Sequence, residues 1–155
     1  MTDYGILLKE AQALGETETH YVPLLSNISA LLFEQLGDLN WAGFYLMDRG
    51  SLVVGPFQGK TACIRIEIGK GVCGTAAERK EAVRVPDVHK FPGHIACDSA
   101  SNSELVVPIF SDGELVGVLD MDSPSLDRFT ADDEEGIKKL AELIGSMGDF
   151  SGLRR

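Results

Sequence analysis

The stretch NWAGFYLMDRGSLVVGPF, residues 40–57, decides the class of fold. Its first half is predicted to be a strand, in which the odd-numbered residues from Trp41 to Met47 face one side and the even-numbered residues face the other. The letters DRGS then form a turn, and LVVGPF is a second strand. The stretch is therefore predicted to be a β-hairpin, and a hairpin indicates an antiparallel sheet.

A second hairpin is predicted from ELVVPIF (104–110) and ELVGVLDMD (114–122), joined by SDG. Periodicity and turn residues predict helices at about 4–14, 24–36 and 72–79, and strands at 62–68 and 82–87. A closing helix is predicted to start at a capping box of Thr130 and Asp133. Residues 88–103 are predicted to be a long irregular stretch. His20 is expected to cap or cover a helix end. This order suggests an α+β fold, with helices packed on one side of the sheet, in one domain spanning residues 1–155.

Composition limits the classes of partner. The chain of 155 residues carries 14 Lys and Arg against 24 Asp and Glu, a formal charge of -10. Such a surface repels phosphate backbones and anionic lipid, so we expect neither nucleic acid nor membrane as a partner. The start MTDYGILLKE lacks the basic and apolar regions of a secretory signal. We therefore expect a cytoplasmic protein.

A glycine motif lies in IEIGKGVCGTAAERK, residues 66–80, where Gly69, Gly71 and Gly74 have the spacing G-x-G-x-x-G. In a dinucleotide-binding fold this motif opens a long helix and is followed by alternating strands and helices. Here the helix is short and a hairpin follows, which favours a tight strand-to-helix turn instead. Cys73 then lies near a helix N-terminus, where the helix dipole favours a thiolate.

The three cysteines are an odd number, which argues against a fixed disulfide framework in a reducing compartment. A free cysteine is most often a buried core residue. Cys63, however, is out of phase with the isoleucines of its strand, and Cys97 lies in the long irregular stretch. Zinc is another alternative, because His94 and Cys97 have H-x-x-C spacing and Cys63, Cys73 and His89 could complete a site, although no C-x-x-C pair is present.

The second hairpin also carries three carboxylates. Asp120 and Asp122 are two residues apart and share a face. A three-residue bulged turn would place Phe110 opposite Glu114 and Glu104 opposite Asp120, whereas a two-residue turn would send Glu104 to the other face. Three acids on one face raise one another's proton affinity and suit a ligand ammonium group. The alternative is that all three are solvated surface charges.

Four blocks together carry a family resemblance: NWAGFYL, GPFQGKTACIRIEIGKGVCGTA, DVHKFPGHIACDSASNSE and GVLDMDS. They resemble the free methionine-(R)-sulfoxide reductases, a single-domain branch of the GAF fold, over nearly the whole chain. The resemblance implies a six-stranded antiparallel sheet with helices, a homodimer and a small pocket for free methionine sulfoxide. It also implies thioredoxin as the external reductant, with no bound cofactor or metal.

The same resemblance implies catalytic roles: Cys97 as the nucleophile, Cys63 and Cys73 as resolving thiols, and Asp122 or Glu104 as the proton donor. It also implies a substrate site in which Glu104, Asp120 and Asp122 are the binding acids and Trp41 and Tyr45 are the pocket walls. Backbone amides near Ile95, Ala96 and Cys97 would bind the substrate carboxylate. We expect Cys63 to be the first partner of oxidised Cys97, because the long loop can fold over that strand while Cys73 is held in a helix.

The rival class is a non-catalytic GAF module that senses or binds a small molecule. Such a sensor is expected within a longer chain that has an output domain, and it has no need of thiols away from the core face. The pattern of thiols and acids therefore favours the enzyme.

Overall fold

The computed structural model describes residues 1–95 and 97–155. Its helices are α1 (Tyr4–Thr17), α2 (Tyr21–Gln35), α3 (Gly71–Arg79), the 3-10 helix η1 (Val88–Lys90) and α4 (Ala131–Met147). Its strands are β1 (Trp41–Asp48), β2 (Ser51–Gly59), β3 (Arg65–Ile66), β4 (Val83–Val85), β5 (Ser103–Ser111) and β6 (Glu114–Ser123). Within these residues, no helix is both long enough and apolar enough to cross a bilayer.

The strands form one six-stranded antiparallel sheet in the order β3-β2-β1-β6-β5-β4. Both predicted hairpins are present, as β1–β2 and β5–β6, and they meet where β1 pairs with β6 at the centre of the sheet. The prediction of an α+β fold with a six-stranded antiparallel sheet is confirmed.

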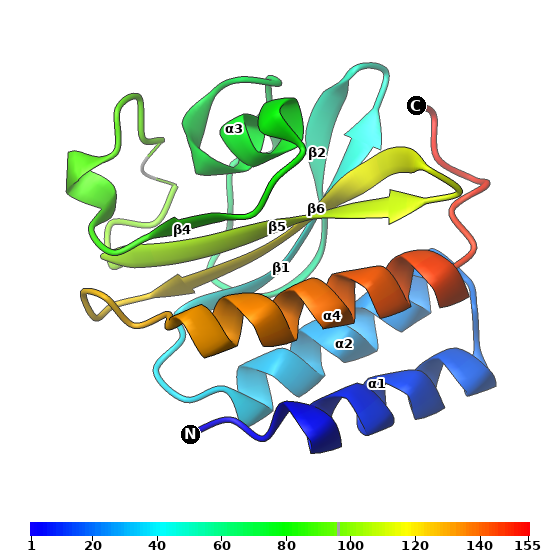
Figure 1. The fold of residues 1–155 in the computed structure, drawn as a ribbon. Coiled ribbons are helices and arrows are strands. Elements are labelled where there is room, and N and C mark those ends of the chain that lie inside the picture. The colour runs from blue at the N-terminus through cyan, green and yellow to red at the C-terminus, as the bar shows by residue number, and fades with distance from the viewer. Residues whose placement is uncertain (96) are drawn as a thin grey trace.

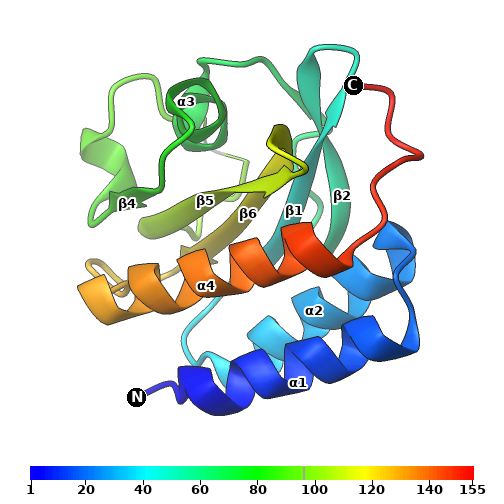
Figure 2. The same ribbon diagram turned by 45° about the vertical axis from the view of Figure 1, so that its right-hand side comes forward.

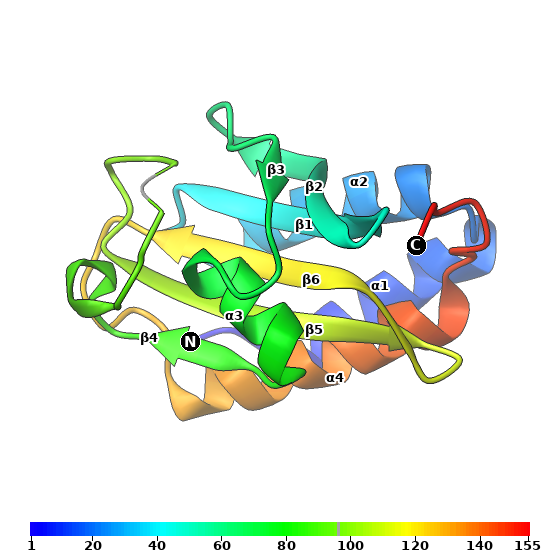
Figure 3. The same ribbon diagram turned by 90° about the horizontal axis from the view of Figure 1, so that it is seen from above.

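The sheet separates two layers (Figures 1 and 2). The long helices α1, α2 and α4 cover one face, while α3 and the loop that contains η1 lie over the other, as the view from above shows (Figure 3). The expectation that all helices pack on one side is therefore wrong for α3. Four of its nine residues are Gly or Ala, so it can lie close to the sheet without large side chains between them.

Each face of the sheet has its own hydrophobic core. On the face of the long helices, Ala42 and Phe44 from β1 belong to the same core as Ile28 of α2 and Ile137 of α4. On the other face, Trp41 and Tyr45 pack in a core that includes α3. Strand β1 is thus buried on both faces, which fixes the side chains that it directs toward α3.

Side-chain caps define where the helices begin. Thr130 and Asp133 form the predicted capping box of α4, with each side chain accepting a hydrogen bond from the other residue's backbone N–H. His20 caps α2, where its ring nitrogen Nδ1 accepts from the Val22 N–H at 3.1 Å. The capping box and the expectation that His20 lies at a helix end are both confirmed.

The turn of the second hairpin decides between the two alternatives for its register. Asp112 and Gly113 form a two-residue turn, with φ of 52° and 78°, so that Ser111 and not Phe110 pairs with Glu114. A bulge between Ile109 and Phe110 then shifts the pairing by one residue. Of the two alternatives, the two-residue turn is therefore the one present, but its expected consequence is wrong, because the bulge places Glu104 opposite Asp122 rather than on the far side.

The strand predicted at 62–68 is also shorter than expected. Only Arg65 and Ile66 pair with β2, and Ile64, which lies within the predicted strand, is 72% exposed. Arg65 binds Asp48 at 2.9 Å and so holds the strand against the β1–β2 turn. The residues before it, 60–64, run outside the regular sheet and pass beside α3.

Candidate active site

A cavity of about 50 Å³ lies between the sheet and the α3 layer. Its walls come from β1, β5, β6, α3, the segment before β3 and the loop after η1. The lining residues include Trp41, Tyr45, Thr61, Ala62, Cys73, His94, Ile95, Cys97, Asp98, Ser101, Glu104, Asp120 and Asp122. A volume of this size holds no more than a few waters. A larger ligand therefore needs the walls to move apart.

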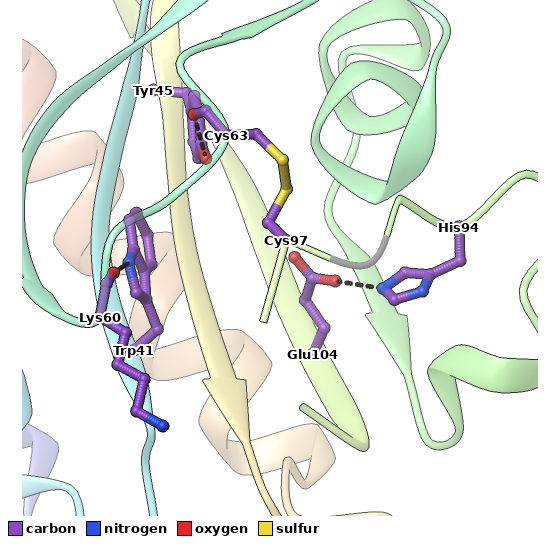
Figure 4. Close-up of a disulfide and its surroundings, with 7 residues drawn as sticks. All are labelled: Trp41, Tyr45, Lys60, Cys63, His94, Cys97 and Glu104. Carbon is purple, nitrogen blue, oxygen red and sulfur yellow. Dashed lines mark hydrogen bonds and ion pairs between the residues drawn. A yellow bond between two sulfur atoms is a disulfide. The ribbon is translucent and has the colours of Figure 1, made fainter. Parts of the chain in front are cut away.

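A disulfide joins Cys97, which lines this cavity, to Cys63, with their Cα atoms 5.5 Å apart (Figure 4). Cys63 comes from the segment before β3, and Cys97 comes from the loop after η1, 34 residues later. Cys73 is a free thiol, buried in the first turn of α3. Cys73 and Cys97 therefore line one cavity, and Cys97 is joined to Cys63 by a bond that thiol–disulfide exchange can open.

The disulfide argues against the zinc alternative, because neither Cys63 nor Cys97 has a free thiolate to offer a metal. His89 is also occupied, since its Nε2 lies 2.9 Å from the side-chain oxygen of Asn102. His94 faces the cavity, where its Nε2 is 4.0 Å from a carboxylate oxygen of Glu104. Burial lowers the pKa of His94, and the nearby charge of His89 lowers it further.

The three acids lie together at the base of the cavity. Glu104 on β5 is paired directly with Asp122 on β6, and Asp120 is two residues along the same strand face. The three residues are only 6%, 9% and 5% exposed in that order. The alternative of solvated surface charges is therefore wrong for this cluster, which we call the acid cluster (Glu104, Asp120 and Asp122).

Burial dominates the electrostatics of the acid cluster. It raises the pKa of Glu104 and of Asp122 well above the usual carboxyl range, and the negative charge of Asp120 raises both further. Burial also raises the pKa of Asp120, against hydrogen bonds that lower it. One oxygen of Asp120, Oδ1, is buried and has no hydrogen-bond partner among the described residues. The cluster is thus suited to hold protons or to bind a cation.

The burial of these like charges gives a first prediction: Asp120→Asn stabilises the substrate-free protein. A carboxyl whose pKa is raised by folding keeps its proton where the unfolded chain has lost it, so its destabilising effect is absent at low pH and appears as pH rises above about 4. We expect a gain of about 1–2 kcal/mol, or roughly 3–8 °C in Tm, at pH 8 and almost none at pH 4. Thermal melts from pH 4 to 8 measure it.

The control is Glu142→Gln, since Glu142 is exposed on α4 and away from the cavity. Its melting temperature should follow that of the original chain at every pH. A destabilised Asp120→Asn protein at pH 8 would show that Asp120 has a partner that stabilises its charge.

Cys73 corrects another expectation. Its place near the start of α3 predicted a thiolate, but burial raises its pKa well above the ordinary range, and the charges of Asp120 and Glu104 raise it further. The helix dipole is outweighed because it contributes less than the loss of hydration and two nearby carboxylates. The sulfur also lies with oxygens of Glu104 and Asp120 in a group whose atoms are all within 4.8 Å of one another.

An aromatic stack lies beside the acid cluster, since Trp41 on β1 is paired with Asp122 on β6. Trp41 lies between Tyr45 and Phe57, with ring centroids 5.8 Å and 5.0 Å away. Trp41 Nε1 donates to the backbone oxygen of Lys60 at 3.2 Å, and the Tyr45 hydroxyl donates to that of Cys63 at 3.0 Å (Figure 4). The two aromatic residues predicted to wall the pocket do line the cavity, and they also bind the segment that carries Cys63.

The predicted carboxylate site is only partly described. The Cys97 N–H donates to the Ile95 carbonyl oxygen at 3.1 Å in this disulfide-bonded form, so it is already occupied. Ala96 lies outside the described residues. The side chain of Ile95 packs over Gly71 at the start of α3, where an added methyl group would lie 3.0 Å from it.

Sequence reasoning missed Asn40. Its side-chain nitrogen donates to Asp98 and to Ser101, both at 3.0 Å, and so fastens the loop that carries Cys97 to the start of β1. The position of Asn40 in the sequence could have indicated this role, because a polar residue directly before a buried strand often binds a neighbouring loop. The Cys63 and Cys97 segments are therefore both attached to β1 and the residue before it.

A curved antiparallel sheet with long helices on one face and a small cavity beneath a short helix on the other defines a GAF domain, and the model of the GAF domain family matches residues 21–146. The free methionine-R-sulfoxide reductase of Escherichia coli is 53% identical over 141 residues, which cover 91% of this chain and 86% of that protein. The chain belongs to the free methionine-R-sulfoxide reductase family of GAF domains.

Solved structures agree with this assignment. The reduced form of fRMsr of Staphylococcus aureus matches this chain with a TM-score of 0.91 at 50% identity, and the match covers 94% of this chain and 94% of that chain. The same protein in complex with substrate has a TM-score of 0.89 at 50% identity, with 94% of this chain and 95% of that chain covered.

Proposed function

We propose that this protein reduces free L-methionine (R)-sulfoxide to L-methionine, with Cys97 as the nucleophile. One observation supports the proposal most strongly: the Cys63–Cys97 disulfide and the buried acid cluster lie at the same cavity. Within that cluster, Asp120 Oδ1 has no hydrogen-bond partner among the described residues. The two thiols that form this disulfide supply the two electrons that reduce a sulfoxide, and the acids supply a site for an ammonium group. The named activity of the Escherichia coli relative is the same reaction class.

The first chemical step is attack of the Cys97 thiolate on the sulfoxide sulfur. The oxygen must gain a proton as the sulfur–oxygen bond weakens, because an oxide dianion is a very poor leaving group. Glu104 and Asp122 are the donors we propose, since burial raises the pKa of both carboxyls well above the usual range and so favours their protonated forms. The protonated oxygen passes from the substrate sulfur to the Cys97 sulfur, the bond between the two sulfurs breaks, methionine leaves, and Cys97 is left as a sulfenic acid.

Asp120 has a different role in the proposal. Its Oδ1 is buried without a partner among the described residues, so an incoming ammonium group would satisfy it. Trp41 and Tyr45 would contact the methyl end of the substrate, and the amides near Ile95, Ala96 and Cys97 would receive its carboxylate. The cavity of about 50 Å³ is too small for that substrate, so binding requires the loop of Cys97 to move away from Cys63.

The second step forms the disulfide, and an external dithiol then reduces it. We propose thioredoxin as that dithiol, and a cytoplasmic location in which it is kept reduced. Cys73 would act later, either by exchange with the Cys63–Cys97 bond or as a reserve thiol. We also propose that residues 1–155 form one domain, since α1 packs on α2 and α4, and that the protein is a homodimer.

The proposed function is tested with purified protein, free methionine sulfoxide, thioredoxin, its reductase and NADPH. We expect NADPH loss that depends on every component and that consumes the R epimer and leaves the S epimer. A protein that binds the sulfoxide without oxidising NADPH, and that yields no methionine even with dithiothreitol as reductant, would instead be a non-catalytic binding module.

Cys63→Ser should stop thioredoxin-driven turnover while one methionine per protein still forms. The reason is that the nucleophile remains but its sulfenic acid has lost the nearest thiol, which the disulfide places 5.5 Å away between Cα atoms. Cys73→Ser is the matched control and should slow turnover less. Chromatography of methionine from reduced protein measures the first quantity, and catalytic Cys63→Ser turnover near the original rate would contradict the role of Cys63.

A further inference from the structure

The segment that carries Cys63 has little regular structure of its own. We call residues 60–64 the resolving segment; it leaves β2 after Gly59, passes along the cavity and enters β3 at Arg65. Thr61 and Ala62 of this segment line the cavity. A segment without strand or helix pairing depends on individual hydrogen bonds for its position.

Three backbone oxygens of the resolving segment accept hydrogen bonds from the sheet. The Val54 N–H donates to Ile64 at 2.8 Å, Trp41 Nε1 donates to Lys60 at 3.2 Å, and the Tyr45 hydroxyl donates to Cys63 at 3.0 Å. The last of these acts on the residue that carries the sulfur (Figure 4). Tyr45 therefore touches the peptide of Cys63 directly.

Tyr45 is a rigid donor. It is 3% exposed, its ring stacks near Trp41, and its strand pairs with β2 on one side and β6 on the other. Burial, and after it the negative charge of Asp120, raises the pKa of Tyr45, so the hydroxyl keeps its proton at any physiological pH. A fixed donor on a central strand can hold the Cys63 peptide in one place while the loop of Cys97 moves.

We propose that the Tyr45 hydroxyl is a positioning group for the resolving step, which holds Cys63 where it can attack oxidised Cys97. This inference rests on the proposed function. In that step the Cys63 sulfur, having lost its proton, attacks the sulfur of the Cys97 sulfenic acid. The sulfur–sulfur bond forms, the sulfur–oxygen bond breaks, and the hydroxide takes up the proton and leaves as water.

The geometry explains why one hydroxyl matters for this step. A disulfide forms only when two Cα atoms come within a narrow distance and the sulfurs are aligned, and here the Cα atoms are 5.5 Å apart. Without the hydroxyl, the Cys63 carbonyl oxygen would form its hydrogen bond with water instead, and the resolving segment would shift toward solvent. The attacking sulfur would then be aligned for a smaller fraction of the time.

The test is Tyr45→Phe, which keeps the ring and removes the hydroxyl. Reduced protein is mixed with one equivalent of free methionine sulfoxide and quenched at intervals; methionine is measured by chromatography and the Cys63–Cys97 linkage by alkylation and mass spectrometry. We expect the rate of linkage to fall about fivefold relative to the rate of methionine release in the same sample. Using the ratio removes any effect of Tyr45 on substrate binding.

Tyr21→Phe is the matched control, because Tyr21 lies on α2 outside the cavity and should change neither rate. An unchanged ratio in Tyr45→Phe would overturn the inference. If Tyr45→Phe released too little methionine to follow, the Cys63–Cys97 bond would be formed with oxidised glutathione instead, and we expect its equilibrium constant to fall about fivefold. An equal constant would also overturn the inference.

Failure of the proposed function would look different. In that case the original chain would release no methionine from the sulfoxide, whereas the glutathione measurement would still compare Tyr45→Phe with the original chain.

Discussion

We expect Cys97→Ser to abolish the reduction of free methionine sulfoxide while the protein remains folded. A hydroxyl is nearly the size of a thiol but is a far weaker nucleophile at neutral pH, and it cannot form the sulfenic acid or the disulfide. We expect a loss of kcat on the order of 10³-fold or more. The assay is the thioredoxin-coupled loss of NADPH, with circular dichroism to show that the sheet and helices are intact.

The control for Cys97→Ser is Ser99→Ala, an exposed position in the same loop. It should retain most of the activity, because Ser99 makes no hydrogen bond through its side chain in the structure as described. Activity of Cys97→Ser above about a tenth of the original, a single decade of rate, would exclude Cys97 as the nucleophile.

The second large effect is selectivity for the free amino acid. Free methionine sulfoxide carries an ammonium and a carboxylate, and the same residue inside a peptide has neither. The buried acid cluster would then lack its cation, and leaving a buried charged group unpaired costs several kcal/mol. We expect kcat/KM for N-acetyl methionine sulfoxide amide to be at least roughly 10³-fold lower than for the free amino acid, which corresponds to about 4 kcal/mol.

Two singly blocked compounds separate the contributions of the two charged groups. The N-acetyl acid lacks only the ammonium and tests the acid cluster, whereas the amide with a free amine lacks only the carboxylate and tests the loop amides. If the N-acetyl acid reacted as fast as free methionine sulfoxide, the acid cluster would have no part in recognising the ammonium.

The parts of the fold that depend on local sequence were predictable. Alternation and turn residues indicated both hairpins, and Thr130 with Asp133 indicated the start of α4. The hairpin register was not predictable, because it depends on a bulge at Ile109 and Phe110 that packing decides. The strand at 62–68 was predicted too long for a similar reason, since periodicity does not show where pairing begins, and here pairing begins only at Arg65.

In the candidate site, too, features set by local sequence could be predicted and features set by tertiary packing could not. The common face of Asp120 and Asp122 could be predicted from their two-residue spacing, but the place of Glu104 on that face could not, because it depends on the bulge at Ile109 and Phe110. The protonation of Cys73 could not, because the helix position is a local property while its burial beside two acids is a tertiary one. Hydrogen bonds between side chains and distant backbone, such as that from Tyr45 to Cys63, also have no sequence pattern.

One measurement tests the central claim most directly: reduced protein is mixed with one equivalent of free methionine (R)-sulfoxide and no reductant, and methionine and cysteine linkages are followed together. We predict one methionine per protein and a Cys63–Cys97 linkage as the dominant species at the earliest time. Formation of no methionine, or an early dominant Cys73–Cys97 linkage, would contradict the account.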